Sequence, residues 1–140
     1  FYTDLLGMAI TLDLRLDGPV IEQMIGLPPG AALLLKVFGD PLQPLGRVEV
    51  IEYERARGVN LYHRARPPAT GLLHVTYGVG DLSPLLWRLR AADVPVIDHG
   101  ERGLLYGDGR VVSFCTPAGF RIEVQERTHA RPVNGSADVE

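Results

Sequence analysis

The sequence predicts an α+β protein built from two related half-domains. Apolar and polar residues alternate over several short segments, which is typical of strands. Residues 71–127 follow the order strand, helix, strand, strand, strand. The segments that close the two halves also resemble each other, since Arg47-Val-Glu-Val-Ile-Glu matches Arg121-Ile-Glu-Val-Gln-Glu. An internal repeat is a strong guide to architecture, and this one places Glu49 on Glu123.

The first half, residues 1–54, is expected to contain three strands. Phe1-Tyr-Thr-Asp-Leu-Leu-Gly-Met is typical of the end of a helix, with Gly7 as its stop residue. The apolar pattern predicts a short helix or an irregular segment at 20–26 and strands at 9–16, 31–38 and 47–54. This half therefore lacks the opening strand of the second half, and we expect residues that precede Phe1 to supply it.

Residues 55–70 are rich in proline, glycine and arginine and are predicted to link the halves. The second half, 71–127, opens with a strand that carries His74, followed by a helix that begins at Asp81 or Ser83. After the helix we expect a short strand at 94–97, a polar loop at 98–103, strands at 104–106 and 110–116 around a turn at 107–109, and a last strand at 120–126. Residues 128–140 are predicted to be a disordered tail.

Composition narrows the classes of function. The chain has 140 residues, a net charge of -3 and one cysteine, Cys115. The weakly acidic balance gives no electrostatic footprint for nucleic acid or for an anionic membrane, so neither is an expected partner. A single cysteine excludes an intrachain disulfide and fits a reducing compartment, which favours a cytoplasmic protein.

Three side chains form the candidate site. His74 shares its strand face with Thr76, and Glu123 lies on the polar face of the last strand, with Glu49 at the equivalent place in the first half. If the halves curl into one cup, all three line it. One imidazole and two carboxylates suit a divalent cation such as Fe, Zn, Mn, Ni or Co. A single strand glutamate or histidine is more often a solvated or structural residue, but the repeat of the carboxylate favours the metal interpretation.

Three stretches carry a family resemblance. They are Leu73-His-Val-Thr-Tyr-Gly-Val-Gly-Asp-Leu, Ala91-Ala-Asp-Val-Pro-Val and Ser113-Phe-Cys-Thr-Pro-Ala-Gly-Phe-Arg-Ile-Glu-Val. In this order and spacing they resemble the vicinal oxygen chelate superfamily, which includes glyoxalases, bleomycin-resistance proteins and type I extradiol dioxygenases. The resemblance covers residues 1–127 and implies two βαβββ units that form an open, cup-shaped mixed sheet around a metal ion.

The resemblance also implies roles for individual residues. His74, Glu123 and Glu49 match metal ligands of the superfamily, and the position of its fourth ligand, a histidine, would lie upstream of Phe1. Glu49 and Glu123 are the candidate catalytic carboxylates, because in the glyoxalase and epimerase branches a carboxylate moves the substrate proton. Three further residues are expected to contact the substrate: Tyr106, Arg121 and His99.

The favoured function is that of a metal-dependent enzyme, a lyase, isomerase or oxygenase, acting on a small molecule with two adjacent oxygens. A homodimer is expected from the resemblance. Catechol cleavage is disfavoured, because Leu104-Leu105-Tyr106 occupies the region of the extradiol histidine and Ser113 the position of its tyrosine. The alternative is a non-catalytic protein that binds or sequesters a small molecule in the same cup, although the presence of all three candidate ligands counts against it.

Overall fold

The computed structural model describes residues 1–43, 45–66, 68–104 and 107–127. The chain divides into two compact units, which are described separately. Unit 1 contains Phe1–Thr70 and Pro117–Gly119, and unit 2 contains Gly71–Thr116 and Phe120–Glu140. The predicted tail at 128–140 and the candidate residue Tyr106 lie outside the described residues.

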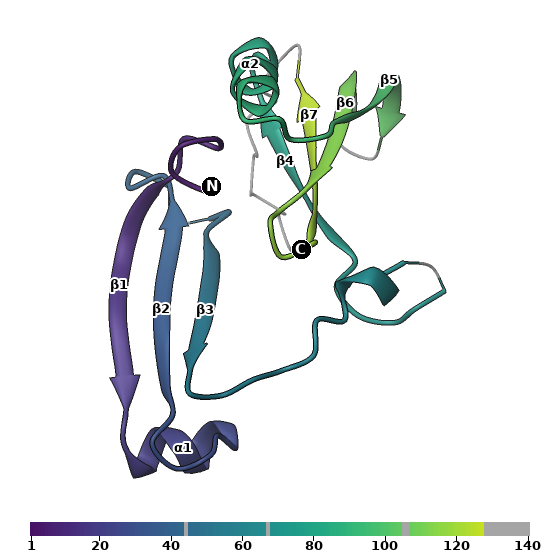
Figure 1. Ribbon diagram of the computed structural model, residues 1–140. Helices are drawn as coiled ribbons and strands as arrows, with labels where there is room; N and C mark the ends of the chain where they lie inside the picture. The colour runs from purple at the N-terminus through teal and green to yellow at the C-terminus, as the bar shows by residue number, and fades with distance from the viewer. Residues whose placement is uncertain (44, 67, 105–106, 128–140) are drawn as a thin grey trace, which may run out of the picture. The chain divides into compact units, whose positions relative to one another are not determined.

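Unit 1 contains a three-stranded antiparallel sheet in the order β1-β2-β3 (Figure 1). A helical turn at the start of the chain ends at Gly7, whose φ of 72° is a conformation that glycine adopts readily. The elements that follow are β1 (Ala9–Asp17), α1 (Pro19–Ile25), β2 (Ala32–Gly39), β3 (Val48–Glu54) and the short helix η1 (Tyr62–Arg64). Among the described residues, β3 pairs with β2 on one side and with no strand on the other.

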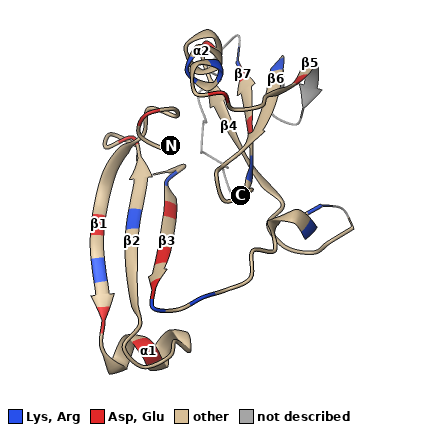
Figure 2. Ribbon diagram, in the orientation of Figure 1, with Lys and Arg blue, Asp and Glu red and all other residues tan. Residues whose placement is uncertain are grey.

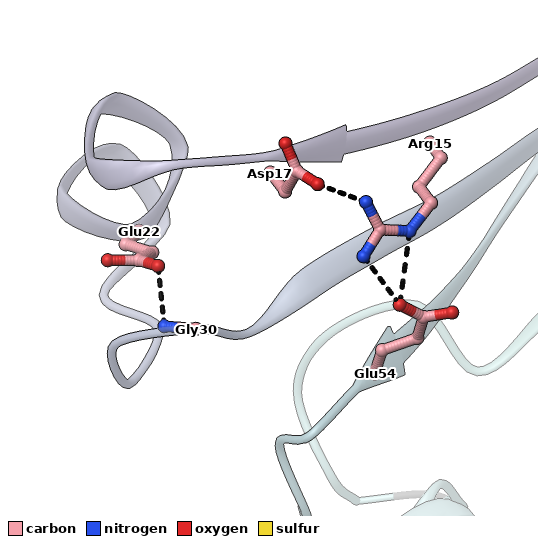
Figure 3. Close-up of polar contacts among 5 residues, drawn as sticks. All are labelled: Arg15, Asp17, Glu22, Gly30 and Glu54. Carbon is pink, nitrogen blue, oxygen red and sulfur yellow. Dashed lines mark hydrogen bonds and ion pairs between the residues drawn. The ribbon is translucent and has the colours of Figure 1, made fainter.

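Charged residues are spread along the strands of unit 1 (Figure 2), and ion pairs connect these strands. Arg15 on β1 donates two hydrogen bonds to one oxygen of Glu54 on β3, at 2.9 and 3.1 Å, and also pairs with Asp17 (Figure 3). Its side chain reaches past β2, where the small, buried Ala32 pairs with Asp17 and Glu54. In the α1 turn, Glu22 accepts a hydrogen bond of 2.6 Å from the Gly30 amide.

Unit 2 contains a mixed four-stranded sheet in the order β4-β7-β6-β5, with β4 parallel to β7 and the other pairs antiparallel. Its elements are β4 (His74–Val79), α2 (Ser83–Ala91), β5 (Ile97–Leu104), β6 (Gly107–Cys115) and β7 (Arg121–Glu126). The order strand, helix, strand, strand, strand is as predicted. With its two sheets and few helices, the molecule confirms the predicted α+β class.

Helix α2 lies beside the sheet of unit 2 (Figure 1), and the core of this unit consists of buried apolar side chains from the helix region and from one face of the sheet. Leu82, Leu85 and Leu89 of the helix region are buried, and so are four apolar residues of that sheet face: Val112, Phe114, Ile122 and Val124. Burial of these side chains is the main favourable term that holds the helix to the sheet. The Leu82 amide also donates to Glu126 Oε1 at 2.9 Å, which ties the start of α2 to β7.

Predictions for two regions of unit 2, 94–103 and 107–109, were wrong. Residues 98–103, predicted as a polar loop, belong to strand β5, while 94–96, predicted as part of a strand, carry no strand. Residues 107–109, predicted as a turn, are the start of β6 and pair with 102–104. In both places the pairing of β5 with β6 decides the conformation, and local composition does not reveal it.

In the part of the chain that the structure describes, no helix combines the length and the apolar character needed to cross a bilayer.

Gly109 is required by the close approach of β7. A Cβ at this position would lie 1.8 Å from the carbonyl oxygen of Glu126, a backbone atom that cannot move without disturbing the sheet. We expect Gly109→Ala to lower the free energy of unfolding by about 1–3 kcal/mol, measured by urea denaturation.

The matched control for this substitution is Gly80→Ala, because a Cβ at Gly80 meets no atom within 4 Å. Equal stability of the two variants would contradict the close approach of β6 and β7.

Asp98 supports the β5–β6 pairing through charge. The Arg110 guanidinium, which donates to Asp98 Oδ2 at 2.6 and 3.2 Å, and the Gly100 amide lower the pKa of the Asp98 carboxyl below its ordinary value of 3.8. A lowered pKa in the folded state means that the charged form stabilises the fold above pH 3.8, and this contribution is lost as the pH falls through the folded-state pKa.

We therefore expect Asp98→Asn to have a lower Tm than the unchanged protein at pH 7. The difference should shrink towards zero as the pH falls below 3.8, in thermal melts followed by circular dichroism. A difference in Tm that is constant from pH 7 to pH 3 would show that the ion pair does not act in this way.

Candidate functional site

The parallel pairing of β4 with β7 brings candidate residues onto one face of the sheet. His74 pairs with Arg121, and Thr76 pairs with Glu123. Side chains of paired residues project to the same side, and the next residue along each strand projects to the other. This face is therefore opposite to the one that buries Ile122 and Val124 against α2.

Glu123 is the central carboxylate of this face. Its side chain is half-buried, and Thr76 Oγ1 donates a hydrogen bond of 3.0 Å to Glu123 Oε1. One carboxylate oxygen is thus oriented by a hydroxyl group from the neighbouring strand. A hydrogen bond of this kind fixes the direction of a carboxylate in the way that outer-shell partners orient metal ligands.

His74 lies at the first position of β4 and is exposed. Glu123 lies on the adjacent strand, two residues beyond Arg121, the partner of His74. On ideal strand spacing the Cα atoms of His74 and Glu123 are therefore about 8 Å apart. Side chains of this length can close that distance on a single ion. An imidazole nitrogen and a carboxylate oxygen are ligands that Zn²⁺, Fe²⁺ and related cations accept.

A polar row extends from Glu123 across β6 to β5. Ser113 pairs with Glu123 and is 2% exposed, and its hydroxyl lies 2.8 Å from Nε2 of His99. His99 is half-buried at the point where the β5–β6 register shifts, between Asp98 and Gly100. His99 was expected in a loop, so the prediction of its backbone was wrong, and the strand positions its imidazole through Ser113.

Arg121 is exposed and lies between His74 on β4 and Cys115 on β6, with which it also pairs. Cys115 is exposed as well. An exposed guanidinium beside the His74 position can form charge-assisted hydrogen bonds to an anionic or carbonyl oxygen.

Glu49 lies in unit 1, on β3, where it pairs with Val37 and is exposed. It shares its sheet face with Ile51 and Tyr53, which are also partly exposed, so it is the charged residue on an otherwise apolar stretch. Among the described residues, no three His, Cys, Asp or Glu side chains gather closely enough to hold a metal ion. Within unit 2, His74 and Glu123 lie on one face of adjacent strands.

Two residues of this face, Thr76 and Ser113, were not among the predicted site residues. Both residues could have been found from the two-residue alternation of strands. Thr76 follows His74 by two positions and so shares its face, and Ser113 in the same way shares the face of Cys115. The pairing of Ser113 with Glu123 depends on a register that the sequence does not display.

The structure is similar to solved structures of the glyoxalase fold. A glyoxalase family protein from Bacillus cereus superposes with a TM-score of 0.63 and 18% identity, over 86% of this chain and 78% of that one. A glyoxalase I mutant from Zea mays gives 0.57 and 16%, over 91% and 39%. TnmS3, an antibiotic-binding protein from Streptomyces sp. CB03234, gives 0.51 and 14%, over 91% and 82%.

No protein-family model matches the sequence, and no curated protein matches it. The solved structures confirm the resemblance to the vicinal oxygen chelate superfamily at the level of the fold. A shared fold does not determine function, and these neighbours include both glyoxalase-family and antibiotic-binding proteins.

Proposed function

We propose that the protein is a metal-dependent enzyme, a lyase, isomerase or oxygenase, that acts on a small molecule with two adjacent oxygen atoms. The observation that carries this proposal is the placement of His74 and Glu123 on one face of adjacent strands, with Thr76 bonded to the Glu123 carboxylate. Partial burial of a charge costs free energy. A protein that binds its ligand only through an apolar cavity would therefore not require the half-buried carboxylate of Glu123.

His74 and Glu123 would hold the cation, and Glu49 is proposed as a further ligand because the resemblance to the superfamily implies it. A bound divalent cation supplies Lewis-acid polarisation of two adjacent substrate oxygens. Glu49 or Glu123 is suited to carry the substrate proton, since a carboxylate is a common general base. Arg121, His99 and Tyr106 are proposed substrate contacts, and the hydrogen bond to Ser113 supports His99 in this role because it fixes the ring.

A homodimer in the cytoplasm is part of the same proposal. The single cysteine supports the reducing compartment, and the resemblance to small members of the superfamily supports pairing of two chains.

A second candidate function is non-catalytic binding or sequestration of a small molecule. The similarity to the antibiotic-binding protein TnmS3 favours it. The two functions differ in their dependence on metal. Thermal-shift screening of small oxygen-rich ligands with and without EDTA separates them, because ligand stabilisation that survives EDTA and His74→Ala supports sequestration.

Removal of His74 should remove the metal. We expect the unchanged protein, loaded with Zn²⁺ or Fe²⁺ and dialysed, to retain about one ion per chain, and His74→Ala to retain almost none. Elemental analysis by plasma mass spectrometry measures both, and circular dichroism checks the fold. His63→Ala is the control, because His63 is exposed in η1 of unit 1. Equal metal content in the two variants, or none in the unchanged protein, would refute the proposal.

Thr76 should tune the affinity for metal. Thr76→Val keeps the shape of the side chain but removes the donor to Glu123 Oε1, so the carboxylate loses its fixed direction. We expect metal affinity to fall by about 10–100-fold, measured by competition with a fluorescent chelator.

Thr11→Val is the matched control for this substitution. It removes a threonine hydroxyl that donates to the Val37 carbonyl at 3.2 Å within unit 1 and leaves Glu123 untouched. Unchanged affinity in Thr76→Val would mean that Glu123 is not a metal ligand or that Thr76 does not orient it.

A further inference from the structure

A cavity of about 310 Å³ lies at the end of helix α2, within unit 2. Arg90 and Asp93 line it together with four apolar residues of α2 and of the segment that follows the helix: Leu86, Val94, Pro95 and Val96. The cavity is separate from the polar sheet face of the candidate site, since the two share no residue. Its volume is at the lower end of the range for small-molecule sites, which suits a small ligand.

The end of α2 fixes the backbone around the two charged residues of the cavity. The Val94 amide donates to the Leu89 carbonyl at 2.9 Å, and the Asp93 amide donates to the Arg90 carbonyl at 3.1 Å. This is the hydrogen-bond pattern of a Schellman motif, in which the residue after the C-cap has a left-handed conformation. Asp93 is that residue, and its φ is 54°.

Asp93 is an unfavourable residue for the stability of this helix end. Glycine adopts a positive φ without strain and is the usual residue at this place in the motif, whereas aspartate only tolerates it. The negative end of the helix also repels a carboxylate, because it is stabilised by cations. Strained positions often occur where a function needs the residue. A contact with a ligand therefore explains the Asp93 carboxylate better than helix stability does.

The charges of Arg90 and Asp93 are both available to a ligand. Both side chains are exposed, and neither forms an ion pair or a hydrogen bond within the described part of the chain. A ligand with one negative charge would be attracted by Arg90 and repelled by Asp93. A ligand that carries a carboxylate and an ammonium group can pair with both residues at once.

We propose that unit 2 binds a small zwitterion in this cavity, an α-amino acid with an apolar side chain. The ligand carboxylate binds the Arg90 guanidinium, whose planar donors suit it. The ammonium group binds Asp93 at the negative end of α2, where a cation is favoured. The apolar side chain contacts Leu86, Val94 and Val96, which are half-buried and become further removed from water. This inference does not rest on the proposed metal site, which uses other residues.

The test compares leucine with two compounds that each keep one of its charges. Isocaproate has the leucine skeleton without the ammonium group, and isoamylamine has it without the carboxylate. Affinities come from isothermal titration calorimetry, and two-dimensional NMR of isotope-labelled protein follows the amide chemical shifts. We expect leucine to bind about tenfold more tightly than either compound, because each charge-assisted contact adds affinity. The shifted amides should centre on residues 86–96.

Two substitutions remove one charge each. Asp93→Asn keeps the backbone, because asparagine also adopts the left-handed conformation readily. We expect this variant and Arg90→Gln to bind leucine about tenfold more weakly than the unchanged protein. Asp93→Asn should keep or raise the Tm, since it takes a negative charge away from the helix end. Arg64→Gln is the matched control, because Arg64 is an exposed arginine of η1 in unit 1, and it should bind leucine normally.

Leucine must bind better than its singly charged relatives for the inference to hold. Equal affinity for leucine and isocaproate, or for leucine and isoamylamine, would show that one of the two charged contacts is absent. Full affinity in both variants, or shifted amides outside residues 86–96, would place the site elsewhere. Absence of leucine binding at millimolar concentration would also overturn the inference. EDTA should change none of these results, and a loss of leucine binding in EDTA would assign leucine to the metal site instead.

Discussion

The register of β4 against β7 is the constraint on which the rest of unit 2 depends. It brings Thr76 beside Glu123, two residues 47 positions apart in the chain. A shift of one residue would turn the carboxylate towards α2 and a buried apolar residue towards the polar face, so the hydrophobic pattern of β7 specifies the register strongly. The Thr76 hydroxyl confirms it in the structure, because its bond to Glu123 forms only when both side chains project to the same side.

The register also places the apolar residues that pack with α2 and the candidate site residues on opposite faces of the sheet. One face of the sheet buries Ile122 and Val124 with the leucines of α2, and burial there supplies the main stabilising free energy. The other face is free to carry polar groups, and some of them are buried: Ser113 and Gln125 are 2% and 0% exposed. Buried polar groups cost stability unless they are hydrogen-bonded, and for Ser113 the partner is His99.

Much of the fold, and the strand faces on which the candidate residues lie, could be predicted from the sequence, because both follow from alternation. The strands that pack against apolar layers have a clear two-residue period, and the repeat of Arg47–Glu52 in Arg121–Glu126 makes Glu49 and Glu123 candidates together. Strand β5 could not be predicted in the same way. It is an edge strand with a register shift at His99, and edge strands are often short of apolar residues. Gly109 likewise resembles a turn residue locally, yet the Glu126 carbonyl, which is distant in sequence, explains it.

The fold alone leaves catalysis and sequestration open, since both kinds of protein are similar to it. The side chains of the polar face bear on this choice. A surface that binds an apolar drug is best lined by apolar and aromatic groups with few polar contacts. Here one face combines the His74 imidazole, the Arg121 guanidinium and a Glu123 carboxylate that Thr76 orients. Such a set pairs poorly with an apolar ligand, because each charged group would lose water without gaining a partner, whereas a chelating anion satisfies all of them at once.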